Sequence, residues 1–285
     1  MPSVLDEEYV LEMEESPPFS WLKQAHERII NCDTLKINGS KVHAQGNAFT
    51  TALITREMVR SMYFELDEAI SDPRGEKHVV ISYSGNNPAA LRFLEHAEGK
   101  GSVISTGGNL KRLARNRGWE FFSLPKGMPA RFAFPELFGC IFGASNSIDT
   151  DSIRKKSESL TPTTPTELNE GKRIAIGIGK GSTLIVYGER REGIARRFQE
   201  DLLQNASLPT YRMSEVQYSF LNPTDISHII HISSPTSTKL RDSFLIPLSD
   251  TIEDAIYGSI LSAYVSIYIS ILKKLEILLL DRYNE

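Results

Sequence analysis

The sequence predicts an α/β protein of two subdomains, each a parallel sheet flanked by helices. Short apolar segments that favour strands alternate with segments of helical periodicity, which is typical of parallel sheets covered on both faces. Across residues 151–170, Thr and Pro replace this apolar rhythm and indicate a boundary. The chain has 285 residues, 40% of them hydrophobic, and is therefore long enough for two cores.

The first half shows the alternation most clearly. Apolar residues at helical spacing predict helices, β-branched runs predict strands, and Pro, Gly and Asp mark their ends. The expected helices cover residues 18–30, 49–69, 88–97 and 110–117. The expected strands cover residues 34–37, 41–44, 78–82, 102–105 and 120–124.

The second half repeats this architecture without a visible sequence repeat. The expected elements are strands over 183–187, 228–232 and 244–247 and a helix over 192–204. A helix can also begin near Thr164 and run to about residue 180, because Thr164 and Glu167 can satisfy first-turn amides. The predicted division is an N-terminal subdomain over 1–150, a linker over 151–170 and a C-terminal subdomain over 171–285.

A long apolar helix is expected to end the C-terminal subdomain. Residues 255–272 carry no formal charge and approach the length of a membrane span, but four serines and three tyrosines interrupt them. We interpret the segment as a buried helix and expect no membrane partner. Small side chains recur along it at Gly258, Ser262, Ser266 and Ser270, a stripe that lets another helix approach closely, including one from a second copy.

Charge and cysteine content exclude several classes of protein. A net charge of -4 gives no reason to expect nucleic acid as a partner. The acidic N-terminus lacks the basic and then apolar pattern of a signal peptide. Cys32 and Cys140 are the only cysteines, which supports neither a disulfide framework nor a cysteine metal site. We therefore expect a protein of the reducing cytoplasm, and the histidine spacing indicates no metal.

The most informative segment covers residues 79–91, where an apolar strand runs into Ser82-Tyr-Ser-Gly-Asn and then a helix. The first amides of a helix lack backbone partners, and Ser82 and Ser84 add hydroxyls, so this turn can hold an anion. Gly85 permits close approach of the backbone. These residues are also typical of an ordinary strand-ending turn. The next strand ends in Ser105-Thr-Gly-Gly, and two polar strand ends at one sheet edge favour a small anionic ligand.

A third segment, Pro125-Lys-Gly-Met-Pro-Ala-Arg-Phe-Ala-Phe-Pro, places Arg131 in a loop between prolines. Together with Ser82-Tyr-Ser-Gly-Asn and Ile104-Ser-Thr-Gly-Gly, it resembles the sugar isomerase (SIS) domain family, specifically the bifunctional phosphoglucose/phosphomannose isomerases. The similarity is clearest over residues 40–145. The resemblance implies two flavodoxin-like SIS subdomains, a homodimer, a phosphorylated sugar as ligand, and no metal or organic cofactor.

The resemblance also assigns roles to residues. In that family a carboxylate moves a proton between adjacent sugar carbons, an arginine stabilises the developing oxyanion, and a histidine helps to open the ring. Arg131 matches the arginine, although a guanidinium could equally bind a phosphate. The substrate-binding positions implied are Gly46, Asn47, Ser82, Ser84, Gly85 and Asn87.

Several family positions carry other residues here. Gln204 stands at the position of the base, and its amide cannot accept a proton at neutral pH. Tyr218 falls where the family has its histidine, and Ala48 replaces a phosphate-binding serine. Three carboxylates could serve as another base: Glu200, Asp201 and Glu215. The sequence therefore supports three hypotheses, namely a rearranged active isomerase, a noncatalytic sugar-phosphate sensor and a dimeric scaffold.

Overall fold

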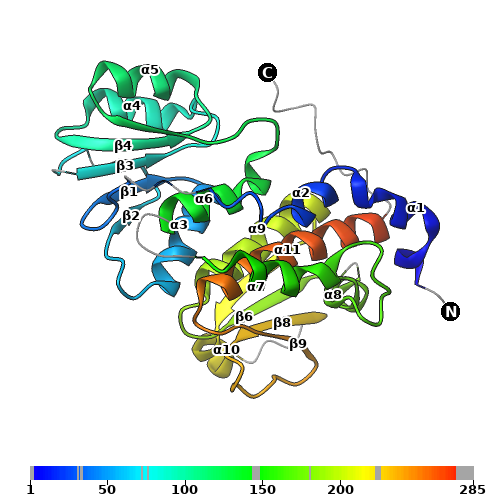
Figure 1. Ribbon diagram of the computed structural model, residues 1–285. Coiled ribbons are helices and arrows are strands. Elements are labelled where there is room, and N and C mark those ends of the chain that lie inside the picture. Colours follow the sequence, from blue (N-terminus) through cyan, green and yellow to red (C-terminus); the bar gives the residue numbers. More distant parts are fainter. Residues whose placement is uncertain are drawn as a thin grey trace. The chain divides into compact units, whose positions relative to one another are not determined.

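Two parallel sheets contain the β-branched segments of the sequence (Figure 1). The computed structural model describes residues 3–273 except 31, 33, 34, 72, 76, 143–147, 180 and 222–225. Its contacts divide the chain into a first-sheet unit, Arg28–Ile148, and a second-sheet unit, Met1–Glu27 with Asp149–Glu285. The predicted α/β class, with two parallel sheets flanked by helices, is confirmed.

The first-sheet unit has five parallel strands in the order β2-β1-β3-β4-β5. The strands are β1 (Lys41–Ala44), β2 (Glu65–Asp67), β3 (Lys77–Ile81), β4 (Lys100–Ser105) and β5 (Glu120–Ser123). Helices α4 (Pro88–His96) and α5 (Gly108–Asn116) lie on one face, and α3 (Asn47–Met58) and α6 (Phe134–Phe142) on the other (Figure 1). The chain leaves β1 toward one edge and β3 toward the other, so the topological switch point lies between these two strands.

An apolar cluster holds the central strands of this sheet in place. Val80 of β3 and Val103 of β4 pack with Phe93 of α4 and with Trp119. Gly101 gives the indole room, because a Cβ at that position would lie 2.5 Å from the Trp119 ring. Slippage by one residue would turn these valines away from the helices, so the cluster specifies the register at which β3 and β4 end.

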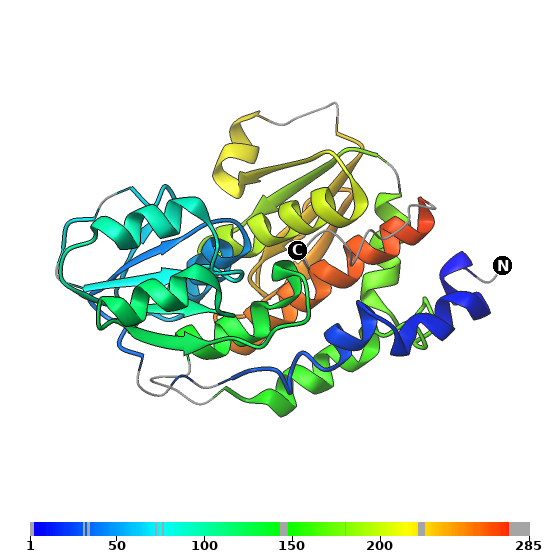
Figure 2. The same ribbon diagram turned by 90° about the horizontal axis from the view of Figure 1, so that it is seen from above.

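The second-sheet unit has four parallel strands in the order β7-β6-β8-β9. They are β6 (Thr183–Tyr187), β7 (Thr210–Ser214), β8 (His228–Ser233) and β9 (Ser243–Pro247). Helices α8 (Glu170–Ile178), α9 (Glu192–Ala206) and α11 (Ile252–Leu272) lie on one side, and α10 (Glu215–Leu221) contacts β6 and β7 from the other (Figure 1). In Figure 2 the orange-red α11 runs beside α9 and α8, which it contacts.

Helix α11 is the apolar segment that the sequence predicts to be buried. Its length and composition would allow it to cross a membrane, and 83% of its apolar 18-residue window is buried. The small-residue stripe contacts α9 of the same chain: Asn205 Nδ2 donates to Ser266 Oγ at 2.9 Å, and Ser262 Oγ donates to Asp201 Oδ2 at 2.8 Å. The helix that approaches the stripe is therefore α9 of the same chain. The sequence had also allowed a helix from a second copy of the chain at this position.

Part of the predicted helix over residues 49–69 is a strand. Helix α3 ends at Met58, and β2 pairs in parallel with β1 at the sheet edge. The helical spacing of Met62, Leu66 and Ile70 is a local signal, and hydrogen bonding to an existing strand outweighs it. Residues 35–37 form no strand, and α2 (Phe19–Lys23) is shorter than the helix predicted over 18–30. The sequence also predicts no element at β7, α10 or α6.

Residues 3–27, which the sequence assigns to the N-terminal subdomain, pack within the second-sheet unit. They form η1 (Val4–Asp6), α1 (Glu8–Leu11), η2 (Glu12–Glu15) and α2. The buried Lys172 ammonium lies 2.8 Å from Asp6 Oδ1, and the Phe19 ring centroid lies 5.8 Å from that of Tyr264. These contacts join segments far apart in the sequence, so local patterns do not reveal them.

The segment predicted as a linker is structured. It contains α7 (Thr150–Ser157) and η4 (Glu158–Leu160), followed by turns up to α8. The predicted N-cap at Thr164 is wrong by five residues, since Asn169 Oδ1 accepts from Lys172 N at 3.0 Å and α8 begins at Glu170. Asn169 Nδ2 also donates to Thr161 O, so the segment is bonded to the helix that follows.

Cys32 and Cys140 form a disulfide within the first-sheet unit, with Cα atoms 4.7 Å apart. Both side chains are buried. Nothing in the local sequence indicates that these two residues pair, and the bond attaches the segment before β1 to α6.

We expect the double variant Cys32→Ser/Cys140→Ser to lower the free energy of unfolding by about 2–5 kcal/mol, because the disulfide restricts the unfolded chain across a large loop. Urea unfolding of the wild type with and without a thiol reductant measures the effect. Reductant should leave the double variant unchanged. The prediction would be contradicted if the wild type has no free thiols, so that the disulfide is formed, and its unfolding midpoint is the same with and without reductant.

Candidate functional site

Three loops follow the carboxyl ends of β1, β3 and β4 and meet at the switch point of the first sheet. The second loop is bonded to the third, because Thr106 N donates to Tyr83 O at 2.8 Å. It is bonded to the first by Asn87 Nδ2, which donates to Gln45 Oε1 at 2.9 Å. The structure thus brings together at one sheet edge the implied substrate-binding residues Gly46, Asn47, Ser82, Ser84, Gly85 and Asn87.

Gly85 allows the second and third loops to touch. Its φ is +70°, and a Cβ on it would lie 2.0 Å from Gly107 O and 2.6 Å from Ser105 Oγ. The Ser105 hydroxyl connects the loops, since it donates to Tyr83 O at 3.2 Å and accepts from Gly107 N at 3.2 Å. Any side chain at position 85 would force these loops apart.

The two serines of the second loop present hydroxyls in different ways. Ser82 is only 8% exposed, and its hydroxyl bonds to no residue that the structure describes. Ser84 is exposed, and its Oγ accepts from Asn86 N at 3.2 Å, which leaves its hydrogen available. Both hydroxyls can therefore donate to an anion at this edge.

Two asparagines cap the helices that begin at this edge. Asn87 Oδ1 accepts from Ala90 N at 3.0 Å at the start of α4. Asn86 Oδ1 accepts from Asn109 N at 3.0 Å in the first turn of α5. Each cap satisfies one first-turn amide, and a further amide of α5 donates to the carbonyl oxygen of Gly85 at 2.9 Å. The remaining first-turn amides and the helix dipole still favour negative charge. Asn87 thus has a structural contact, and its role in ligand binding stays a prediction.

Lys126 adds a cation near these loops that the sequence patterns did not predict. It follows β5, its side chain is exposed, and its Nζ lies 3.8 Å from a Cβ built on Gly107. It forms no ion pair or hydrogen bond with the described part of the chain. Tyr83 Oη donates to Pro125 O at 3.2 Å and so bonds this loop to the serine loop. The sequence signal that could have identified Lys126 is its place in the same motif as Arg131, where it is a second basic residue.

Arg131 lies in η3 (Ala130–Phe132) of the same loop. Its guanidinium carbon lies 5.2 Å from the Phe132 ring centroid, and the side chain is partly buried. The loop is held by Arg28, whose Nη2 donates to Phe132 O at 2.5 Å. The Nε and Nη2 of Arg28 each lie 2.8 Å from an oxygen of the buried Glu136 of α6, and this two-point ion pair fixes the guanidinium that bonds to the loop. The predicted contact of Arg131 with a sugar or its phosphate stays a prediction.

No family model matches the chain. A D-glucosamine-6-phosphate 4-epimerase of Sulfolobus acidocaldarius is 29% identical over 143 residues, which cover 47% of this chain and 45% of the relative. A bifunctional phosphoglucose/phosphomannose isomerase of Caldicellulosiruptor bescii is 28% identical over 151 residues, covering 47% and 44%. The chain thus spans about half the length of these curated relatives.

A solved structure of a glucose-6-phosphate isomerase like protein from Thermus thermophilus has the same fold, with a TM-score of 0.65 at 12% identity. The match covers 98% of this chain and 99% of that one. These similarities support assigning the chain to the SIS-domain proteins related to the bifunctional phosphoglucose/phosphomannose isomerases. Each unit contains a parallel sheet flanked by helices, as the resemblance implies.

The residues at the positions of the family's base and histidine lie in the second-sheet unit. Gln204 is exposed near the end of α9, where the helix has returned to the amino edge of its sheet. Tyr218 of α10 packs against an apolar cluster that includes Leu184 and Val186. Their assignment to catalytic positions stays a prediction, and within this unit neither side chain has an environment typical of a proton-transfer group.

Two of the three alternative carboxylates are paired with arginines of α9. Asp201 is fully buried, and Oδ2 lies 2.9 Å from Arg197 Nε and accepts from Ser262. Burial raises the pKa of Asp201, despite the charge of Arg197. Glu200 pairs with Arg196 one turn away on α9, at 3.0 Å. Both ion pairs lie within α9, and Asp201 also joins this helix to α11 through Ser262.

Glu215 has the most open setting of the three. It directly follows β7, and 38% of its side chain is exposed. Burial alone would raise the pKa of Glu215, but hydrogen bonds from Ser233 and His231 and the charge of Arg191 outweigh it and lower the pKa. Glu215 is therefore a carboxylate at neutral pH and a weaker base than a free one.

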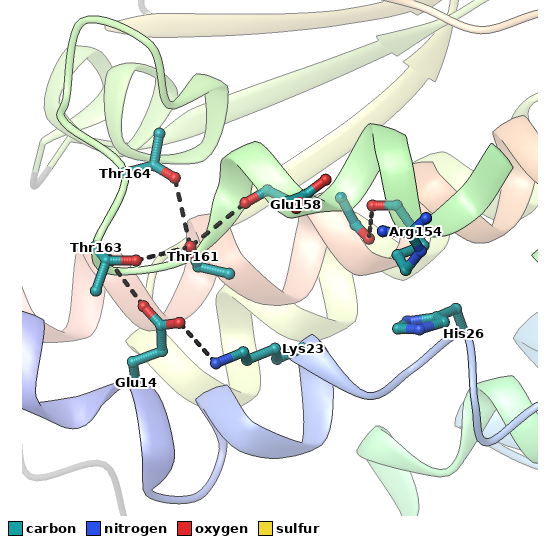
Figure 3. A pocket seen from close by; sticks show the side chains of 9 residues that line it. Glu14, Lys23, His26, Arg154, Glu158, Thr161, Thr163 and Thr164 are labelled. Atoms are coloured by element: carbon teal, nitrogen blue, oxygen red, sulfur yellow. Dashed lines mark hydrogen bonds and ion pairs between the residues drawn. The ribbon is translucent and has the colours of Figure 1, made fainter. Parts of the chain in front are cut away.

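A separate pocket of about 380 Å³ lies in the second-sheet unit, between α2 and the segment from α7 to Thr164 (Figure 3). Its polar groups bond to one another: Lys23 Nζ lies 2.9 Å from Glu14 Oε1, and Thr163 N donates to Glu14 Oε2 at 3.2 Å. We assign no ligand to this pocket, because its main charges are already paired. Among the described residues, no group of three or more His, Cys, Asp and Glu could hold a metal ion.

We expect Gly85→Ala to be more destabilising than Gly39→Ala. Both glycines have positive φ angles, +70° and +73°, so each substitution costs about 1 kcal/mol in backbone strain. Only the Cβ at position 85 meets other atoms, whereas nothing lies within 4 Å at position 39. We expect a further loss of about 2 kcal/mol in the free energy of unfolding for Gly85→Ala, measured with urea. Equal losses would contradict the contact between the loops.

Proposed function

We propose that this SIS protein binds the phosphate of a phosphorylated hexose at the carboxyl edge of the first sheet. The observation that carries the proposal is the meeting of three strand-end loops at the switch point, where the Ser82 and Ser84 hydroxyls and first-turn amides can donate to one anion. Lys126 adds positive charge at the same edge. The names of the relatives, a glucosamine 6-phosphate epimerase and phosphoglucose/phosphomannose isomerases, support a phosphorylated sugar as the ligand.

We further propose that binding occurs without isomerisation, so that the protein acts as a sugar-phosphate sensor. The position matched to the family base carries Gln204, and two of the alternative carboxylates are paired with arginines of α9. An isomerase acting on glucose 6-phosphate or mannose 6-phosphate, with fructose 6-phosphate as product, is the alternative. The scaffold hypothesis loses its main support because the small-residue stripe contacts α9.

A homodimer and a cytoplasmic location remain predictions from the sequence. Disulfides are rare in reducing compartments outside hyperthermophiles, so the Cys32–Cys140 bond bears directly on the location. A thiol count tests whether the bond exists in the native cells. Free thiols are alkylated at lysis, and the protein is then purified and its unmodified cysteines are counted.

We expect fructose 6-phosphate, glucose 6-phosphate or glucosamine 6-phosphate to raise the thermal unfolding midpoint, because a ligand at 100 times its dissociation constant adds about 2.7 kcal/mol of stability. Unphosphorylated glucose should have no effect. The Ser82→Ala/Ser84→Ala variant should lose the response, and Ser71→Ala, an exposed serine of the same unit, should keep it. No shift with any of the three sugar phosphates would overturn the proposed ligand.

A coupled assay for conversion of glucose 6-phosphate to fructose 6-phosphate tests the sensor proposal with the same protein. We expect no turnover above the uncatalysed rate. Turnover that disappears in Arg131→Ala and in one carboxylate variant would replace the sensor with an active isomerase.

Lys126→Met should weaken sugar-phosphate binding by about tenfold or more, because a charged hydrogen bond contributes about 1.5–3 kcal/mol. Lys126→Arg should retain most of the affinity. Lys111→Met is the matched control, because it removes a lysine of the same unit that lies elsewhere. The Lys111 ammonium lies 5.4 Å from the Phe121 ring centroid and not beside the loops. Titration calorimetry measures all four proteins. Unchanged affinity in Lys126→Met would remove this residue from the site and leave the serines' role intact.

A further inference from the structure

The second sheet has a switch point of its own, between the carboxyl ends of β6 and β8. Gly188 follows β6, Ser233 ends β8, and Glu215 follows β7 on the neighbouring strand. The rule that places a ligand at the first sheet therefore applies to this edge as well. A side chain of the protein already lies there.

The Glu215 carboxylate occupies this edge and accepts two short hydrogen bonds. Its Oε1 lies 2.6 Å from His231 Nε2 and 2.6 Å from Ser233 Oγ. Both donors belong to β8, and each is only 2% exposed. Gly188 provides the space, because a Cβ there would lie 2.8 Å from Ser233 Oγ and 3.2 Å from Glu215 Oε1. The strand ends thus form a preorganised cradle for one anionic group.

Further groups around this cradle favour negative charge. The Arg191 guanidinium is buried and lowers the pKa of Glu215, together with the two hydrogen bonds. It pairs with Asp250 at 2.9 Å, and its Nε has no hydrogen-bond partner within the described ranges. From Ser233, hydroxyl contacts continue to Ser237 at 2.7 Å and on to Ser234 at 2.9 Å, which is partly exposed. The cradle is therefore connected to the surface by hydroxyl groups.

The carboxylate that fills the cradle is weakly attached to the rest of the fold. Glu215 is the first residue of α10, a seven-residue helix without a buried residue. Val216 and Phe220 are 66% and 82% exposed, and Tyr218 supplies the apolar contact with the sheet. A short exposed helix with few buried contacts opens at lower cost than the core. Glu215 can therefore leave the cradle without disrupting the sheet.

We propose that the carboxyl edge of the second sheet is an anion-binding site that Glu215 occupies itself, and that the carboxylate or phosphate group of a small metabolite binds there in its place. His231 Nε2 and Ser233 Oγ would donate to that group as they donate to Glu215. Displacement of the carboxylate releases α10 from the sheet edge, so ligand binding is coupled to exposure of this helix. The proposal is independent of the sugar-phosphate site on the first sheet.

Glu215→Ala tests the proposal by removing the internal anion. We expect sodium acetate and inorganic phosphate to raise the unfolding midpoint of this variant by several degrees more than sodium chloride of equal ionic strength. Their dissociation constants should be at least tenfold lower than for the protein that retains Glu215. The measurements use a Ser82→Ala/Ser84→Ala background, so that phosphate at the first sheet does not contribute. The control is Glu189→Ala, which removes an exposed carboxylate near Gly188 and should respond as the background does.

Two further measurements make the outcome decisive. Adding Ser233→Ala to Glu215→Ala should abolish the response, and an anion effect that persists would place binding elsewhere and overturn the proposal. In the background protein, acetate or phosphate should speed hydrogen exchange in residues 216–221 without changing exchange in β6. If Glu215→Ala does not fold, Glu215→Gln replaces it, since it keeps the side-chain shape and removes the charge. A response to acetate and phosphate no greater than that to chloride would overturn the proposal.

Discussion

The parallel register of β1, β3 and β4 is the constraint on which the first site depends. Ala44 pairs with Ile81, and Ile81 pairs with Ile104, so the three strands end at one level of the sheet. The loops that follow must therefore emerge side by side, and the Gly85–Gly107 contact is possible only because of this. The valine, phenylalanine and tryptophan cluster under α4 and α5 holds the register, so the geometry of a polar site is set by apolar packing some distance away.

Local sequence patterns were sufficient for the parts of the fold that depend on neighbouring residues. The runs that form β1, β3 and β4 and the turn that contains Ser82 and Gly85 carry their own signals, namely β-branched residues followed by small polar ones. Features that depend on distant residues were missed. The pairing of β2 with β1, the Asp6–Lys172 contact and the Cys32–Cys140 bond each join segments whose sequences say nothing about one another. Lys126 was missed for the same reason, since its position beside Gly107 depends on tertiary packing.

The two switch points differ in whether the protein supplies its own anion. Ser82 follows β3 and Ser233 ends β8, and these strands occupy the same place in their sheets. The Ser82 hydroxyl bonds to no described residue, whereas the Ser233 hydroxyl lies 2.6 Å from a carboxylate. An internal carboxylate competes with an external anion for the same donors, because two negative charges cannot share them at low cost. The same topology therefore gives an open edge at one sheet and a filled edge at the other.

Binding and turnover place different demands on such an edge. Holding a phosphate requires donors directed at one point, and strand-end hydroxyls with helix amides supply these without any titratable group. Moving a proton between sugar carbons requires a carboxylate with an accessible oxygen and a pKa matched to the reaction. Donors that converge on a carboxylate lower its pKa and so weaken it as a base, which is the situation of Glu215. A chain can therefore keep the first property without the second, since loops that follow strand ends are fixed by the sheet, while a base depends on one residue such as that at position 204.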